Sequence, residues 1–315
     1  MVQLGANELV KSESAIEALK LIMQETTATF DCIFLDIRMP EIDGIELCKI
    51  IRVLPRYKNT PILMVTQMAD KPNIDSAFAA GASDYFTKPV EISRLRSRLQ
   101  LFENAIKQKN VKPKIGFVPK SAQTKDLGNC KVDLLEPIEI VGVKGVITYY
   151  SLENYVAQLL RTSLLGSSMM ALKLKNFEEL HCKASSADIR FLVTDVAEAI
   201  SDALVDASFL IAYAGNGIYI CVIEEGWHKD TQRLVLKSWK ILEQMDLCLT
   251  GGEPLHISLL DGPTVHLNSY ADEKAVDSIN EVKTSIEKVN STLKKSTLDT
   301  IFWGASENTS YWDET

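Results

Sequence analysis

Long apolar runs are missing from this sequence, and its first residues do not show a basic segment followed by an apolar one. A membrane-spanning helix needs about 20 consecutive apolar residues, and a secretory signal needs that basic-then-apolar order. We therefore expect a soluble, cytoplasmic chain with no membrane partner.

Histidines and cysteines are few and dispersed. The six cysteines form no C-x-x-C pair and lie in apolar surroundings, and the four histidines are also scattered. This pattern suits reduced, buried thiols better than disulfides or a zinc site. A net charge of −8 argues against a general attraction to nucleic acid, and no helix-turn-helix is recognisable, so we expect no nucleic-acid partner.

What the sequence does contain is a repeated α/β pattern. Its 315 residues, of which 46% are hydrophobic, are enough for about two domains. Between Glu8 and Gln108, apolar runs alternate with helical patterns, which predicts a parallel sheet wrapped by helices. The predicted strands are ELVKS, CIFLD, PILMVTQ and DYFTKP, and the predicted helices are SAIEALKLIMQ, GIELCKIIRVL, NIDSAFAAGA and ISRLRSRLQLFENAIKQ.

A second α/β pattern follows a segment with many lysines and prolines, which reads as a linker. The pattern comprises the helix SLENYVAQLLRTS, the strand MMALKLK, the helix SADIRFLVTDVAEAISDAL, the hairpin FLIAYAGNGIYICVIE, the helix TQRLVLKSWKILEQM, the strand PLHISLLD and a last helix near 273–295. We expect a first domain over 1–110, a linker over 111–145, a second domain over 146–293 and a tail over 294–315.

Three polar residues end predicted strands of the first domain. Asp36, Thr66 and Lys88 should meet at one edge of the sheet, because loops converge at the carboxyl ends of parallel strands. A carboxylate, a hydroxyl and an ammonium there suit phosphoryl chemistry, with Asp as nucleophile and the other two as partners of the phosphoryl oxygens. Alternatively each is only a solvated strand end, but the order, the spacing and the DIRMPEIDG and TKP contexts favour a site.

With these motifs, residues 1–110 resemble the receiver domain of bacterial two-component response regulators, which has a flavodoxin-like, doubly wound α/β fold. The resemblance implies that Asp36 is the phospho-acceptor, and that Thr66 and Lys88 are switch residues that sense the aspartyl phosphate. It places Tyr85 at the aromatic switch position and implies a sensor histidine kinase as partner.

The resemblance also implies a Mg²⁺ site made of Asp36, the backbone carbonyl of Arg38 and an acidic pair at the end of the first strand. That pair is missing, and VQLGAN reads as the end of the first helix, so we expect the chain to begin inside a receiver that lacks its first strand. Either the chain is a shortened piece of a longer protein, or it is a pseudo-receiver that binds partners without phosphorylation. We expect the chain as given to take no phosphate and to hold no Mg²⁺, and the full-length protein to do both.

The hairpin FLIAYAGNGIYICVIE has a tight turn at Gly215–Gly217 that can be explained without any function. The order of elements around it nevertheless resembles a GGDEF domain, the nucleotidyl-cyclase-like α/β fold of diguanylate cyclases. The signature loop then falls on Gly215, Asn216, Gly217, Ile218 and Tyr219, without the family's acids. The strand that should carry metal-binding aspartates has Lys173 and Lys175 instead, so we expect no cyclase activity. These lysines could contact a nucleotide phosphate, although alternation in ALKLK is also typical of a half-exposed strand with solvated lysines.

The last helix has an apolar stripe with spacings of 4 and 3, formed by Ala275, Ile279, Val282, Ile286, Val289 and Leu293. At under three heptads we expect it to pack on its own domain rather than to form a dimer seam. As a whole we expect a response regulator that dimerises through its receiver and acts through contacts with a downstream protein, in quorum sensing, virulence or motility control. The alternative is a sensor or effector of a nucleotide or of cyclic di-GMP.

Overall fold

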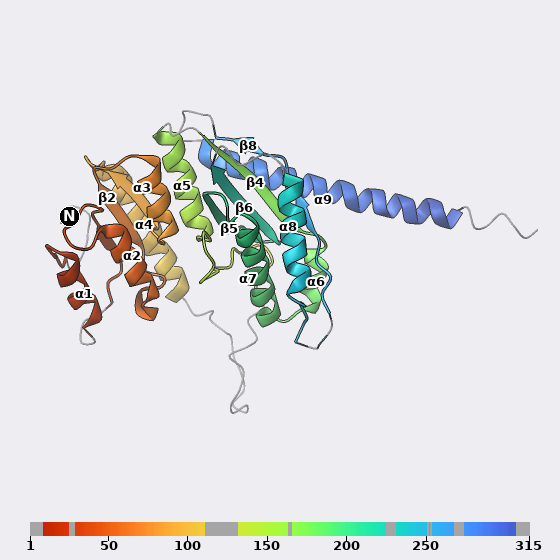
Figure 1. Ribbon diagram of the computed structural model, residues 1–315, viewed down its shortest axis with the longest axis horizontal. Coiled ribbons are helices and arrows are strands. Elements are labelled where there is room, and N and C mark those ends of the chain that lie inside the picture. Colours follow the sequence, from red (N-terminus) through yellow and green to blue (C-terminus); the bar gives the residue numbers. More distant parts are fainter. Residues whose placement is uncertain are drawn as a thin grey trace, which may run out of the picture. The chain divides into compact units, whose positions relative to one another are not determined.

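The chain forms two compact units, residues 1–127 and 128–315, in a computed structural model (Figure 1). The structure describes residues 9–24, 29–110, 132–162, 166–224, 231–250, 252, 254–267 and 274–306. No helix within these ranges is long and apolar enough to cross a membrane.

The first unit is a three-stranded parallel sheet with helices between the strands. Its sheet has the order β1-β2-β3, and the middle strand β2 is buried along most of its length. Such a continuous apolar strand is typical of a parallel sheet covered on both faces. The elements are α1 (Ala15–Met23), β1 (Ile33–Leu35), α2 (Gly44–Val53), η2 (Pro55–Tyr57), β2 (Ile62–Thr66), α3 (Lys71–Ala79), β3 (Asp84–Thr87) and α4 (Ile92–Asn110).

Side-chain caps explain where three of these helices begin. Ser14, Asp43 and Asp70 stand just before α1, α2 and α3, and each side chain accepts a hydrogen bond from the backbone N–H three residues later. Such bonds satisfy N–H groups that have no partner within the helix. The helices were therefore predictable from polar cap residues followed by helical apolar spacing.

The strand expected in ELVKS is not formed, since Leu9–Ser12 has no strand structure. Leu9 and Val10 are about half exposed, at 51% and 44%. A strand needs a hydrogen-bonding neighbour, and the sheet of described residues ends at β1, whose one partner there is β2. The apolar composition of ELVKS predicted a strand, but the described part of the chain offers it no pairing edge.

The second unit is built on an antiparallel sheet with the order β5-β6-β4-β7, and β8 also pairs with β4. The core order β4-α7-β5-β6-α8-β7 is the βαββαβ arrangement of ferredoxin-like folds. The elements are α5 (Tyr149–Arg161), β4 (Ser167–Leu174), α6 (Phe177–Lys183), α7 (Ser186–Ala203), β5 (Phe209–Tyr213), β6 (Ile218–Glu224), α8 (Thr231–Gln244), β7 (Leu259–Asp261), β8 (Val265–His266) and α9 (Lys274–Ser306).

Alternation along β4 divides the second unit into two layers. Met170, Leu172 and Leu174 join the main apolar core together with residues of α7 and α8. Lys173 points to the opposite face, where its ammonium contacts α9, as expected because successive side chains of a strand face opposite ways. Figure 1 shows α7 and α8 side by side and α9 crossing the sheet.

Three boundaries differ from expectation: those of the strand in PLHISLLD, of the linker and of the last helix. The strand expected in PLHISLLD is formed only by Leu259–Asp261. Residues 132–145, predicted as linker, pack on the second unit, since Ile138 and Ile140 lie in its core and the carbonyl of Leu134 accepts a hydrogen bond from Asn216 N–H. Residues 111–131 of that linker lie outside the described part of the chain.

The last helix reaches further than predicted, because α9 continues to Ser306 through the first part of the expected tail. Its expected packing on its own domain is confirmed, since Ile279, Val282 and Ile286 are fully buried. Residues 307–315 lie outside the described ranges.

Candidate functional site

Asp36 follows β1 directly and lies where α2 approaches the sheet. A Cβ on Gly44 would lie 2.1 Å from the backbone oxygen of Asp36. Only glycine therefore lets α2 begin this close to the strand end. Gly44 N–H also donates to the carbonyl of Ile37 at 3.0 Å, which closes the loop. The DIRMPEIDG stretch thus holds the Asp36 backbone through a glycine contact and a capped helix.

The three predicted phosphoryl-site residues meet at this edge. Lys88 Nζ lies 2.5 Å from Asp36 Oδ2, and the Thr66 side chain is close enough to Asp36 to lower the pKa of its carboxyl. Arg38 N–H donates to Asp36 Oδ1 at 3.3 Å. Lys88 N–H donates to the carbonyl of Thr66 at 2.8 Å, so the ends of β2 and β3 are tied together behind the carboxylate.

These contacts keep the Asp36 carboxyl ionised. Burial raises its pKa, but the hydrogen bonds from Lys88 and the Arg38 N–H, the charge of Lys88 and the nearby Thr66 side chain outweigh burial. The pKa of Asp36 is therefore lowered from its ordinary value. Because Asp36 is about one-third exposed, this ionised oxygen nucleophile remains accessible from solvent.

Tyr85 lies on β3, and its ring is buried. Its hydroxyl donates to the carbonyl of Met68 at 2.8 Å, in the loop after β2. Burial, together with the charges of Asp70 and Asp36, raises the pKa of the Tyr85 phenol. The hydroxyl is therefore protonated, and it anchors the loop that follows Thr66.

The described residues do not fit a complete Mg²⁺ site. No group of three or more His, Cys, Asp or Glu that could hold a metal occurs among them. Both oxygens of Asp36 already accept hydrogen bonds within the protein. Mg²⁺ requires a near-octahedral set of oxygen ligands, and the acidic pair that the receiver resemblance calls for is not found in the described ranges.

The second predicted site is the turn between β5 and β6. Gly215, Asn216 and Gly217 all have positive φ, of 84°, 49° and 70°. A Cβ on Gly215 would meet the Leu135 backbone, and one on Gly217 would meet Phe177. The glycines are thus required by close packing, as the simple hairpin interpretation proposed.

The last two residues of the expected signature loop are core residues of β6. Ile218 is 2% exposed and Tyr219 is fully buried. The Tyr219 hydroxyl donates to the carbonyl of Val193 on α7 at 2.9 Å. They face the interior rather than a catalytic opening.

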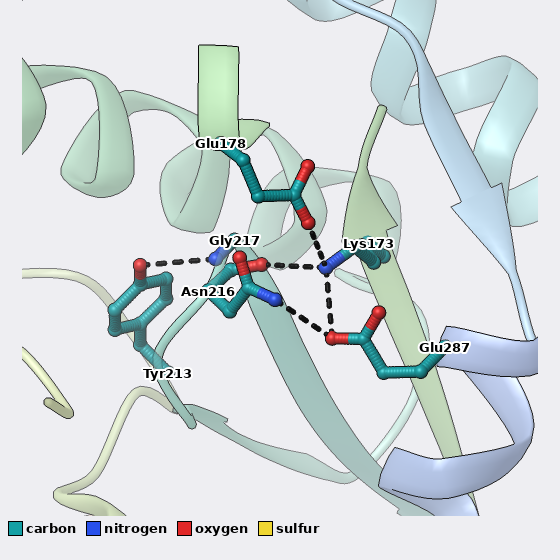
Figure 2. Close-up of polar contacts among 6 residues, drawn as sticks. All are labelled: Lys173, Glu178, Tyr213, Asn216, Gly217 and Glu287. Carbon is teal, nitrogen blue, oxygen red and sulfur yellow. Dashed lines mark hydrogen bonds and ion pairs between the residues drawn. The ribbon is translucent and has the colours of Figure 1, made fainter. Parts of the chain in front are cut away.

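Lys173 is the largest departure from the expected picture, because the interpretation of half-exposed, solvated lysines is wrong for it. Its side chain is fully buried, and its Nζ contacts the carbonyl of Asn216 at 3.0 Å, Glu287 Oε1 at 2.9 Å and Glu178 Oε1 at 3.4 Å (Figure 2). Asn216 Nδ2 donates to the same Glu287 oxygen at 2.8 Å. We call Lys173, Glu178, Asn216 and Glu287 the Lys173 cluster.

Two hydrogen bonds and an ion pair surround the fully buried Lys173 ammonium, which is therefore enclosed in the protein and not open to a nucleotide phosphate. Lys175, two residues further on, is exposed, and its predicted phosphate contact stays a prediction. The sequence alone did not indicate Glu178 and Glu287 as partners, because Glu287 lies 114 positions from Lys173. A hint in the sequence was that Glu287 directly follows Ile286, which belongs to the apolar stripe of the last helix.

Comparison with known proteins identifies the first unit. The response regulator receiver domain family matches residues 3–100. The signal transduction histidine-protein kinase BarA of Escherichia coli (strain K12) is 38% identical over 91 residues, which are 28% of this chain and 10% of that protein. Protein RcaC of Microchaete diplosiphon is 38% identical over 71 residues, which are 22% of this chain and 11% of that protein.

Among solved structures, the receiver domain of Francisella response regulator 1452 is 33% identical, with 30% of this chain and 73% of that chain covered at a TM-score of 0.26. The chain spans about a tenth of the length of the two curated relatives. Residues 3–100 therefore form a response regulator receiver domain with a flavodoxin-like parallel sheet.

Proposed function

We propose that the first unit receives a phosphoryl group on Asp36 from a sensor histidine kinase when an acidic pair completes its Mg²⁺ site. The convergence of Asp36, Thr66 and Lys88 supports this most directly. In the transfer, an Asp36 carboxylate oxygen attacks the phosphorus of a phosphohistidine. The new O–P bond forms as the P–N bond breaks, and the imidazole nitrogen keeps the electron pair and takes up a proton. In this proposal Asp36 and the Arg38 carbonyl would be two of the ligands of a Mg²⁺ ion, which would offset the negative charge of the phosphoryl oxygens.

Lys88 and Thr66 are placed to read the modification. Lys88 now neutralises the carboxylate, and phosphorylation would move the negative charge outward onto the phosphoryl oxygens. Both side chains would move toward the phosphoryl oxygens. The backbone hydrogen bond between Lys88 and Thr66 would transmit this movement to Tyr85 and to the loop after β2, which contains Met68. Phosphorylation would thus bias a two-state receiver and its self-association.

The test of this step is chemical. The chain extended by a designed strand that ends in two acidic residues should, when incubated with acetyl phosphate and Mg²⁺, gain a phosphoryl group that hydroxylamine releases, since an aspartyl phosphate is an acyl phosphate. An extended chain that gains none would instead support the pseudo-receiver, which binds partners without phosphorylation.

We infer that the second unit is a degenerate GGDEF-like domain that signals through a downstream protein partner, without catalysis. The βαββαβ order is compatible with that fold. The internal use of Lys173 and the burial of Ile218 and Tyr219 favour protein contact over nucleotide chemistry. A cytoplasmic homodimer, acting in quorum sensing, virulence or motility control, is the setting that we propose.

A calorimetric titration separates this view from the alternative of a nucleotide or cyclic di-GMP sensor. We expect neither GTP nor cyclic di-GMP to release heat of binding at micromolar concentrations. If one of them binds, Lys175→Ala shows whether the exposed lysine contributes, and the protein-contact proposal for this unit is contradicted.

A further inference from the structure

Helix α9 docks on the second unit through apolar residues that repeat every seven positions. Ile279, Val282 and Ile286 are fully buried, and Ile286 lies against Gly262, near the Ala171 carbonyl of β4. A slide by seven residues turns a helix by only about 20° relative to its original face. The apolar contacts alone therefore do not decide between two docking positions one heptad apart.

The sequence supplies apolar residues for the slid position. Moving each residue to the place of the one seven earlier brings Ile286 to Ile279, Val289 to Val282 and Leu293 to Ile286. Exchanges of this kind, between apolar side chains of similar volume, are tolerated in cores. The opposite slide brings the small Ala275 to the place of Val282 and would leave a cavity.

Charged contacts, in contrast, distinguish the two positions. The buried Lys173 ammonium lies 2.9 Å from Glu287, in the cluster of Figure 2, and the slide would bring Lys294 to that place. Lys283 Nζ lies over the Tyr149 ring of α5, 5.0 Å from its centroid, and Asn290 would replace it. The slide thus turns an attraction into a repulsion and removes a cation–π contact.

We propose that Lys173 fixes the register of α9 on the sheet. It favours one of two docking positions that have equivalent apolar contacts. The two positions differ by seven residues, about 10 Å along the helix axis. In coiled coils, a single polar residue in the apolar seam can fix the register at a cost in stability. A change of charge at Lys173 therefore moves α9 along the sheet instead of unfolding the unit. This inference does not depend on the function proposed above.

The test measures the position of α9 in the full chain. Nitroxide-bearing unnatural residues replace Lys240 on α8 and Glu281 on α9, both exposed, and electron–electron resonance gives their distance. Wild type should show one distance. Lys173→Glu should shift it by several ångströms, up to about 10 Å, because Glu at 173 repels Glu287 and attracts Lys294. Lys175→Glu is the matched control on the same strand, and it should leave the distance unchanged.

Two further variants complete the test. Adding Lys294→Glu to Lys173→Glu removes the new attraction and should return the wild-type distance. Lys173→Met removes the charge at similar volume, and it should add a second population with a shifted spin–spin distance. If circular dichroism shows that Lys173→Glu is unfolded, Lys173→Met alone provides the test. A single wild-type distance in every folded Lys173 variant, or a shift that survives Lys294→Glu, would overturn the proposal.

Discussion

Paired charges determine the chemistry of both units at the scale of single residues. In the first unit the Asp36–Lys88 pair is partly exposed, and it keeps a nucleophilic oxygen ionised. In the second unit Lys173 is fully buried among oxygen acceptors. A lysine is thus partly exposed in the first unit and enclosed in the second.

Replacing Lys88 with Ala should raise the pKa of Asp36, because burial then acts without the ammonium. The folded-state pKa of wild-type Asp36 lies below the ordinary value, so its ionised form stabilises the fold above that value. This contribution is lost as the pH falls through the folded-state pKa, and Lys88→Ala should lose it at all pH values. Carboxyl NMR titration checks the pKa, with Lys71→Ala, which breaks the Lys71–Asp75 pair, as the control that should leave Asp36 unchanged.

Arg52 is a second residue whose role can be tested. Its guanidinium donates to the carbonyls of Gly81, Tyr57 and Thr60 at 2.7–2.9 Å, and so joins the loops before β2 and β3 at the end of the sheet opposite Asp36. Arg52→Ala should lower the free energy of unfolding by about 1.5–3 kcal/mol, since charged donors would be removed from part-buried carbonyls. Urea denaturation measures this loss. Arg56→Ala, at an exposed arginine nearby in the sequence, should cost clearly less.

At the scale of elements, caps and apolar spacing were sufficient to predict the helices, and strand ends were sufficient to predict the Asp36 site. Pairing and long-range contacts were not predictable. ELVKS has the composition of a strand but no neighbour to pair with among described residues. In the sequence, Lys173 alternates with apolar residues, as a solvated residue of a half-exposed strand does. Only the three-dimensional fold brings Glu287 of α9 to it.

The start of α2 gives a prediction at this scale. Gly44→Ala places a Cβ against the Asp36 backbone oxygen, so α2 and the strand end must separate. Overpacking of this kind costs about 1–3 kcal/mol, and it should also weaken the Asp36–Lys88 pair. Thermal denaturation and the Asp36 carboxyl resonance report the two effects. Gly142→Ala, where a Cβ meets nothing within 4 Å, should change stability only through its positive φ and should leave Asp36 as it is.

At the scale of the whole molecule, a receiver precedes a βαββαβ unit whose hairpin turn carries no acids. In our account the first unit changes state on phosphorylation, and the second presents a protein-binding surface. Phosphorylation in this account requires Mg²⁺, and no group of three or more His, Cys, Asp or Glu that could hold a metal occurs in the described part of the chain. We therefore expect the chain of 315 residues to remain unmodified by acetyl phosphate.

The most direct test of the central claim, that Asp36 is the phospho-acceptor of a receiver with a complete Mg²⁺ site, is an intact-mass measurement. The 315-residue chain, the same chain extended by a designed strand that ends in two acidic residues, and the Asp36→Asn variant of the extended chain are each incubated with acetyl phosphate and Mg²⁺. The account predicts the mass of one added phosphoryl group on the extended chain alone. An added group on the Asp36→Asn variant, or none on the extended chain, would contradict it.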